Sequence, residues 1–183
     1  FTVPFAYAIA AMVTGTSNAA WIWKTRAWNV LSWILLTVGI ILGGQWAYVE
    51  LGWGGYWAWD PVENASFIPW LVSTAFIHTA IIQEKRGIMK VWNMVLILLT
   101  FALCIFGTYL VRSGVLQSVH DFGSTGLGGY FLGFLGVTLV GGMYLIVASY
   151  RDFKTPNTLE SYLSRESTFL FNNVIFLALA FAT

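Results

Sequence analysis

Charged residues are scarce in this sequence, and cysteine is almost absent. Only 9% of the 183 residues are Asp, Glu, Lys or Arg, whereas a soluble domain carries about a quarter. The net charge of +1 argues against nucleic acid as a partner, because nucleic-acid-binding proteins carry a basic surface. The single cysteine, Cys104, excludes an internal disulfide and a Cys-x-x-Cys metal or redox site. No signal peptide is recognisable, and the sequence starts and stops inside apolar stretches.

Apolar residues dominate instead, at 58% of the chain with a mean hydropathy of +0.73. They form runs near the roughly 20 residues that span a bilayer, separated by short polar segments. Runs of this length must be helices, because lipid satisfies no open backbone groups. We therefore expect an all-α polytopic integral membrane protein, with residues 1–183 forming one transmembrane bundle that is a fragment of a longer protein. About six transmembrane helices or parts of them are expected: Phe1–Met12, Trp28–Val49, Ser66–Gln83 (interrupted by Pro69), Asn93–Val111, Gly129–Tyr150 and one beginning near Thr168.

The basic residues predict the orientation of the bundle. If successive spans alternate in direction, eight of the nine Lys and Arg residues fall on one face and only Arg112 on the other. The positive-inside rule makes the eight-residue face cytoplasmic. Residues 50–65 and 113–128 then lie on the periplasmic face or its organellar equivalent. The eight residues are Lys24, Arg26, Lys85, Arg86, Lys90, Arg151, Lys154 and Arg165.

The first outer segment is rich in tryptophan, tyrosine and glycine. One interpretation is an aromatic belt, because Trp and Tyr favour the membrane interface. The glycines favour another, since glycine allows sharp turns and close approach to a ligand. Aromatic rings on such a loop suit a large planar apolar ligand such as a porphyrin, and composition alone leaves both interpretations open. The residues are Trp46, Tyr48, Gly52, Trp53, Gly54, Gly55, Tyr56, Trp57 and Trp59.

A helix start follows directly at Asp60-Pro61-Val62-Glu63. The two carboxylates have the residue types of an acid/base pair or a cation site. However, Asp60 fits an N-cap, Pro61 the first helical position and Glu63 the third position of a capping box. Because every residue fits its place in that scheme, capping is the favoured interpretation.

The only two histidines are candidates for metal ligation. His78 lies in an apolar run with Thr74 as its polar neighbour. An ionisable group in lipid is a functional candidate, as a metal ligand or part of a proton path. His120 lies on the second outer loop, where it is either a solvated residue or a ligand of haem iron. Arg112 is suited to pair with a haem propionate, and Asp121 to orient His120.

Two stretches resemble known haem-handling proteins. Residues 53–67, WGGYWAWDPVENASF, are similar to the tryptophan-rich "WWD" signature. Together with residues 107–120, GTYLVRSGVLQSVH, they resemble the CcmF family of haem lyases for cytochrome c maturation. The resemblance covers roughly residues 46–150. Tyr56 departs from the family, which often has another tryptophan there, but it keeps an aromatic ring.

The resemblance implies a role for each candidate residue. Residues 46–70 would be the WWD haem-binding segment, and 112–128 the outer loop with a histidine ligand. His120 would ligate the iron of an incoming haem b, and His78 the iron of a resident haem b. In the family each has a partner histidine, which is absent from this sequence. The residues expected to bind the cofactor are Trp53, Gly54, Gly55, Tyr56, Trp57, Trp59, Asp60 and Arg112.

The implied function is that of a haem lyase, or holocytochrome c synthetase, subunit. Such a protein presents haem so that the thiols of a Cys-x-x-Cys-His segment add to the haem vinyl groups as thioethers, and no catalytic residue is assigned here. The implied partners are the haem chaperone CcmE, CcmH with CcmI, the apocytochrome c and the lipid bilayer. The implied location is the inner (cytoplasmic) membrane with a periplasmic haem site, or the mitochondrial inner membrane.

Other functions remain open at this point. NrfE, a lyase specific for nitrite reductase, is hardly distinguishable by pattern. CcsA usually carries a different stretch after Asp-Pro, so Val62-Glu63-Asn64 disfavours it. A transporter with His78 as a proton relay would need polar residues along several spans, and these spans have few. A structural subunit with an aromatic belt and no ligand is a further alternative.

Overall fold

The computed structural model describes residues 1–16, 18–52, 54–116, 118–120, 126–155 and 165–183, and every regular element within these ranges is a helix. In this part of the chain four helices, α2 to α5, are long and apolar enough to cross a membrane, and α1 and α7 are shorter apolar helices. All six expected apolar runs therefore form helices, which confirms the all-α membrane fold. The elements are α1 (Thr2–Thr14), α2 (Ala19–Glu50), α3 (Pro61–Arg86), α4 (Lys90–Ser113), α5 (Gly128–Ala148), α6 (Tyr150–Phe153) and α7 (Arg165–Ala182).

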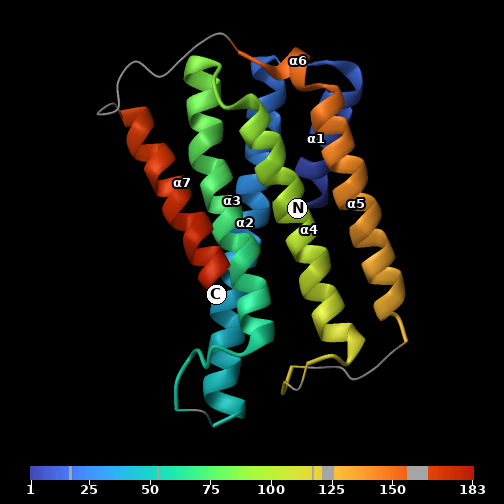
Figure 1. Cartoon of the computed structure of the whole chain (residues 1–183). Helices are drawn as coiled ribbons and strands as arrows, with labels where there is room; N and C mark the ends of the chain where they lie inside the picture. The colour runs from blue at the N-terminus through green and yellow to red at the C-terminus, as the bar shows by residue number, and fades with distance from the viewer. Residues whose placement is uncertain (17, 53, 117, 121–125, 156–164) are drawn as a thin grey trace.

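The helices run up and down, so the two outer segments lie at the same end of the bundle (Figure 1). We call this the loop end: it carries the residues between α2 and α3 and those that follow α4. The connections from α1 to α2 and from α3 to α4, together with α6, lie at the opposite end (Figure 1). This arrangement agrees with the alternation of spans expected from the basic residues.

Helix α3 is the centre of the bundle. It packs against α2, α4 and α7, and 61% of its most apolar stretch is buried, compared with 6% for α2. The helix continues unbroken through Pro69. Helices α2 and α5 expose large apolar side chains along their length, which suits helices that border lipid. Helix α3, which begins at the loop end, is thus held between α2, α4 and α7.

A reciprocal pair of hydrogen bonds joins α2 to α3. The indole N–H of Trp33 donates to Thr74 Oγ1 at 2.8 Å, and that of Trp70 donates to Thr37 Oγ1 at 2.7 Å. The two indole rings stack with centroids 5.2 Å apart. Interhelical hydrogen bonds and close packing hold helices together in lipid, where burial alone contributes little. This brace fixes the distance between the two helices that form the walls of the candidate site.

Candidate functional site

Helix α3 begins at the loop end, and its N-terminus is capped. The backbone N–H of Val62 donates to Asp60 Oδ2 at 3.0 Å, and Glu63 Oε2 accepts the N–H groups of Asp60 at 3.2 Å and Ala58 at 3.0 Å. Asp60 is therefore the N-cap and Glu63 completes the capping box, as the sequence predicts. Just before the cap, Trp59 adopts a φ of 59°, a left-handed conformation that is uncommon for a side chain of this size. The cap and this turn fix the aromatic loop on the start of α3.

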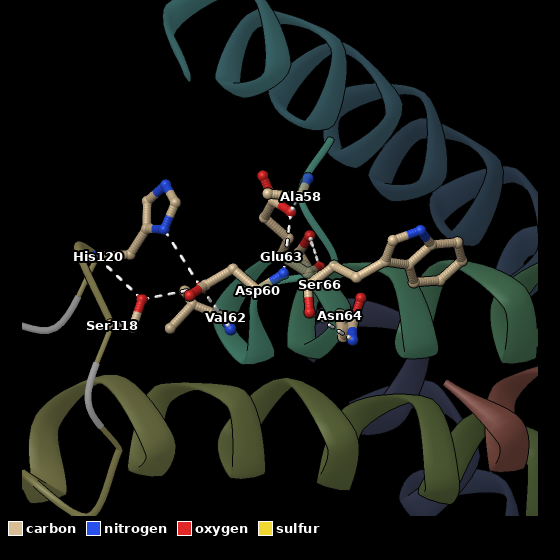
Figure 2. Close-up of polar contacts among 9 residues, drawn as sticks. Ala58, Asp60, Val62, Glu63, Asn64, Ser66, Ser118 and His120 are labelled. Carbon is tan, nitrogen blue, oxygen red and sulfur yellow. Dashed lines mark hydrogen bonds and ion pairs between the residues drawn. The ribbon is translucent and has the colours of Figure 1, made fainter. Parts of the chain in front are cut away.

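The second outer loop attaches to the same carboxylate (Figure 2). The Ser118 hydroxyl donates to Asp60 Oδ2 at 2.8 Å, and His120 Nδ1 lies 3.3 Å from the same oxygen. The backbone N–H of His120 donates to Ser118 Oγ at 3.0 Å. We call these three residues the Asp60 cluster. Asp121, the partner expected for His120, lies outside the described residues. Among the described residues, the carboxylate beside the imidazole is that of Asp60, from the other loop.

A cavity of about 200 Å³ lies against His120, and we call it the His120 cavity. Its lining includes Trp57 and His120 from the two outer segments and the Gly39, Gly43 and Gly44 stretch of α2. A Cβ added to Gly39 or Gly43 would meet no atom within 4 Å, whereas one on Gly44 would come within 2.8 Å of the Tyr56 carbonyl oxygen. The first two glycines therefore leave open space, and the third allows the loop to approach the helix.

A larger cavity of about 620 Å³ adjoins the His120 cavity, and the two share Leu36, Val62 and Ser66. Its volume falls within the range of about 300–1,000 Å³ that is typical of small-molecule sites. Arg112 lies on its wall, together with apolar and small residues of α2, α3 and α4. His120 and Arg112 therefore line neighbouring cavities with a common wall. An apolar body with one anionic edge fits this combination of an apolar lining and a single guanidinium.

The aromatic residues of the loop are divided between the cavity and the surface. Trp57 lines the cavity, and the ring of Trp46 lies 5.9 Å from that of His120. Trp59 is 64% exposed and meets Trp57 edge-on, with an interplanar angle of 87°. Trp57 and Trp59 thus do not form one flat platform, although both remain close to the cavity. Tyr56 is also exposed and stacks on Tyr48 with ring centroids 4.7 Å apart.

Glycines of the loop allow backbone conformations that other residues rarely adopt. Gly52 and Gly54 have φ angles of +65° and +71°, which favour glycine over any residue with a side chain. A Cβ on Gly55 would meet nothing closer than the Trp57 carbonyl oxygen at 4.0 Å. Trp53 lies outside the described residues. The expectation that glycine allows sharp turns here is met at two positions.

His78 forms a separate candidate site in the middle of α3. Its Nδ1 lies 2.7 Å from the backbone carbonyl oxygen of Thr74, and because a carbonyl only accepts, Nδ1 must carry the hydrogen. The neutral ring then has its lone pair on Nε2. Phe169 and Phe176 of α7 lie beside the imidazole, with ring centroids 5.5 and 5.6 Å away. Sequence reasoning missed these two rings, although their spacing of seven residues places them on one face of a helix.

Both histidines are suited to single axial ligation rather than to a multi-ligand metal centre. Among the described residues, no group of three or more His, Cys, Asp or Glu side chains could hold a metal ion. Each imidazole has its Nδ1 beside an oxygen, an arrangement that is common for histidines that bind a metal through the other ring nitrogen. Haem supplies four ligands to its own iron, so one histidine per face is enough.

Comparison with known proteins identifies the family. The profile of the Cytochrome C assembly protein family matches residues 1–117. The chain belongs to this family. Over 176 residues it is 48% identical to the cytochrome c-type biogenesis protein CcmF of Haemophilus influenzae, covering 96% of this chain and 27% of that protein. NrfE of the same organism is 46% identical over 132 residues, covering 72% of this chain and 21% of that protein.

A solved structure of this cytochrome c assembly family has the same fold. The protein titled "Cytochrome c Heme Lyase CcmF" is 42% identical, with a TM-score of 0.78, and the match covers 98% of this chain and 26% of that one. The expected resemblance to CcmF is therefore confirmed, as is the multi-pass membrane fold. The chain spans about a quarter of the length of these relatives. NrfE is also among the similar proteins. The chain therefore resembles both CcmF and NrfE, as its motifs suggest.

Proposed function

We propose that this chain is the haem-handling part of a cytochrome c haem lyase. The observation that carries the proposal is the meeting of two loops at one cavity, with Trp57 from the first and His120 from the second. The Asp60 cluster joins those loops. Relatives named as cytochrome c-type biogenesis proteins and a structure named as a haem lyase support the same assignment.

Incoming haem b is the substrate of this site. Segment 46–70 and loop 112–128 hold it, with His120 Nε2 as an axial ligand of the iron and the Trp57 ring against the porphyrin. A Cβ at Gly39 or Gly43 would meet no atom within 4 Å, so haem could lie against α2 at these two positions, and Arg112, which lines the adjoining cavity, pairs with a propionate. Gly54, Gly55, Tyr56 and Trp59 shape the loop around it, and Trp53 remains a predicted haem-binding residue. These residues bind and orient haem, and such positioning of a reactant can by itself lower the barrier of the reaction.

The reaction is the addition of two cysteine thiols of a Cys-x-x-Cys-His segment across the two vinyl groups of haem. Each addition forms one C–S bond, and the thiol hydrogen goes to the other vinyl carbon. The haem supplies the vinyl groups, and the protein fixes which face of haem meets the apocytochrome c. No residue of this chain is assigned an acid or base role in the step.

His78 is the residue that would hold a second, resident haem b within the membrane. Its Nδ1–H bond to Thr74 O orients the ring, and the aromatic residues of α7 provide an apolar wall beside it. An apolar wall with one imidazole is the composition expected of such a site. Its partner histidine, like that of His120, lies in other parts of the longer protein.

The setting of this activity is the inner membrane, with the loop end facing the periplasm or, in mitochondria, the equivalent compartment. The haem chaperone CcmE delivers haem to this end, and CcmH with CcmI presents the apocytochrome c. The scarcity of basic residues in the loop-end segments supports this orientation.

An absorption spectrum of the purified full-length protein tests the proposal. We expect a Soret band in the wild type, and loss of the incoming-haem part of it in His120→Ala with the helical content unchanged. A wild-type protein with no Soret band in either redox state would instead favour a transporter or a purely structural subunit. Haem capture equal to wild type in His120→Ala would refute the ligand role of this residue.

A lyase of the NrfE type is the second candidate, and the 46% identity to NrfE favours its inclusion. The full-length gene should be expressed in two strains, one lacking CcmF and one lacking NrfE. Restoration of general c-type cytochromes in the first strain supports the CcmF-type function. Restoration confined to nitrite reductase in the second strain supports the alternative.

A further inference from the structure

The carboxylate of Asp60 makes more contacts than a helix cap requires. Its Oδ2 atom accepts from the Val62 N–H at 3.0 Å and from the Ser118 hydroxyl at 2.8 Å, and it lies 3.3 Å from His120 Nδ1. The side chain of Asp60 is only 13% exposed and that of His120 only 23%. One oxygen atom thus joins the start of α3, the second outer loop and the imidazole in a site that is largely screened from water.

We propose that Asp60 is a positioning residue for His120, which sets the ring's tautomer, its orientation and its strength as an iron ligand. This inference rests on the proposed function, because it concerns the imidazole that would bind the incoming haem. A carboxylate only accepts hydrogen bonds, so its contact with Nδ1 requires the hydrogen to be on that nitrogen. The lone pair of the neutral ring then lies on Nε2, which points away from Asp60 in Figure 2.

The negative charge has a consequence beyond geometry. A carboxylate hydrogen-bonded to the far nitrogen of a ligating histidine makes the imidazole a more basic ligand. A more electron-rich ligand stabilises ferric iron more than ferrous iron, since the ferric ion carries the larger positive charge. Asp60 is therefore expected to hold the reduction potential of haem on His120 lower than a neutral residue would.

Capping alone does not require this charge. Asn and Ser serve as N-caps about as well as Asp, so either would keep the bond to the Val62 N–H. Asn keeps a neutral acceptor of the same length, which still reaches His120 Nδ1, whereas the shorter Ser does not. The two substitutions therefore separate three contributions of Asp60: the cap, the hydrogen bond to the ring, and the charge.

The test uses the purified full-length protein loaded with haem b, in the wild type and in Asp60→Asn and Asp60→Ser. The measurements are the reduction potential of the haem signal that disappears in His120→Ala, and the affinity for ferric and for ferrous haem. We expect Asp60→Asn to shift the potential upward and to weaken ferric binding more than ferrous binding. In Asp60→Ser we expect ferric affinity to fall on the order of 10–100-fold, as is typical when such a partner of a metal ligand is lost.

A capping control removes the structural explanation. Asn18 caps α2 by accepting from the Trp21 N–H at 2.9 Å, at the end of α2 opposite to the cavity. Asn18→Ala should lower the unfolding temperature and leave the haem potential and affinities unchanged. If the role of Asp60 were capping alone, both Asp60 variants would keep the wild-type haem potential and affinities, as this control does, and, because Asn and Ser retain the cap, the wild-type unfolding temperature as well.

The outcomes separate the inference from the function on which it rests. If the potential and the ferric affinity of both Asp60 variants equal those of the wild type, while His120→Ala abolishes the signal, the positioning role is refuted and the proposed function stands. If the wild type itself has no signal that depends on His120, both are overturned. A potential shift in Asp60→Asn with a wild-type unfolding temperature supports the inference.

Discussion

Filling the His120 cavity from the α2 side should block haem binding without harming the fold. Gly43 lines the cavity of about 200 Å³, and a Cβ added there meets no atom within 4 Å, so we expect the leucine of Gly43→Leu to occupy part of this cavity without a clash at its Cβ. Glycine within a helix is less stable than alanine by about 0.5–1 kcal/mol. The variant should therefore be as stable as the wild type or slightly more stable, while the affinity for haem falls at least about tenfold, or roughly 1.4 kcal/mol.

Two matched variants serve as controls for this prediction. Gly136→Leu, on α5, also enters open space but lies outside the cavity, so haem binding should remain at the wild-type level. Gly44→Ala places a Cβ within 2.8 Å of the Tyr56 carbonyl oxygen, so it should displace the aromatic loop and lower the unfolding temperature. Haem titration followed by absorbance, with thermal unfolding in detergent, measures both effects. Wild-type haem affinity in Gly43→Leu would refute the placement of haem against α2.

Three further predictions concern the aromatic ring, the membrane histidine and the helix brace. Trp57→Ala should lower haem affinity, and Trp57→Phe should retain most of it, because stacking needs a ring rather than an indole N–H; equal titration curves for the two would contradict a stacking role. His78→Ala should remove the resident haem b from the reduced-minus-oxidised spectrum while His120-dependent binding persists, and survival of that signal would make His78 a packing or relay residue. Thr74→Val leaves the Trp33 indole N–H without its acceptor and should lower the free energy of unfolding in mixed micelles by about 1–2 kcal/mol; no change would show that the brace contributes little.

Span positions could be predicted because lipid imposes a simple requirement. A run of about 20 apolar residues has no stable alternative to a helix in a bilayer, and all six runs form helices. The start of α3 could also be predicted from the sequence, because a capping box depends on residues that are close to one another in sequence. Asp60, Pro61 and Glu63 occupy the positions that their side chains indicate.

The site was harder to predict because it depends on contacts between distant residues. Asp121, the acidic neighbour of His120 in sequence, lies outside the described residues, and sequence reasoning did not foresee that the Asp60 carboxylate, 60 residues earlier, would lie beside the imidazole. Trp57 and Trp59 meet edge-on, and Trp59 has a left-handed backbone; no sequence pattern predicts either feature. Sequence reasoning also missed that Gly39 and Gly43 line a cavity, because the sequence of an apolar span does not show which of its glycines border a cavity.

The 60-residue separation between Asp60 and His120 also matters during synthesis of the chain. At about 5–20 residues per second, a ribosome needs about 3–12 s to make the residues that separate the helix cap from the imidazole. During this interval the hairpin of α2 and α3 can already sit in the bilayer, with its carboxylate facing water and no imidazole beside it. A nascent protein therefore passes through a stage in which its tryptophan loop is complete but His120 has not yet been translated.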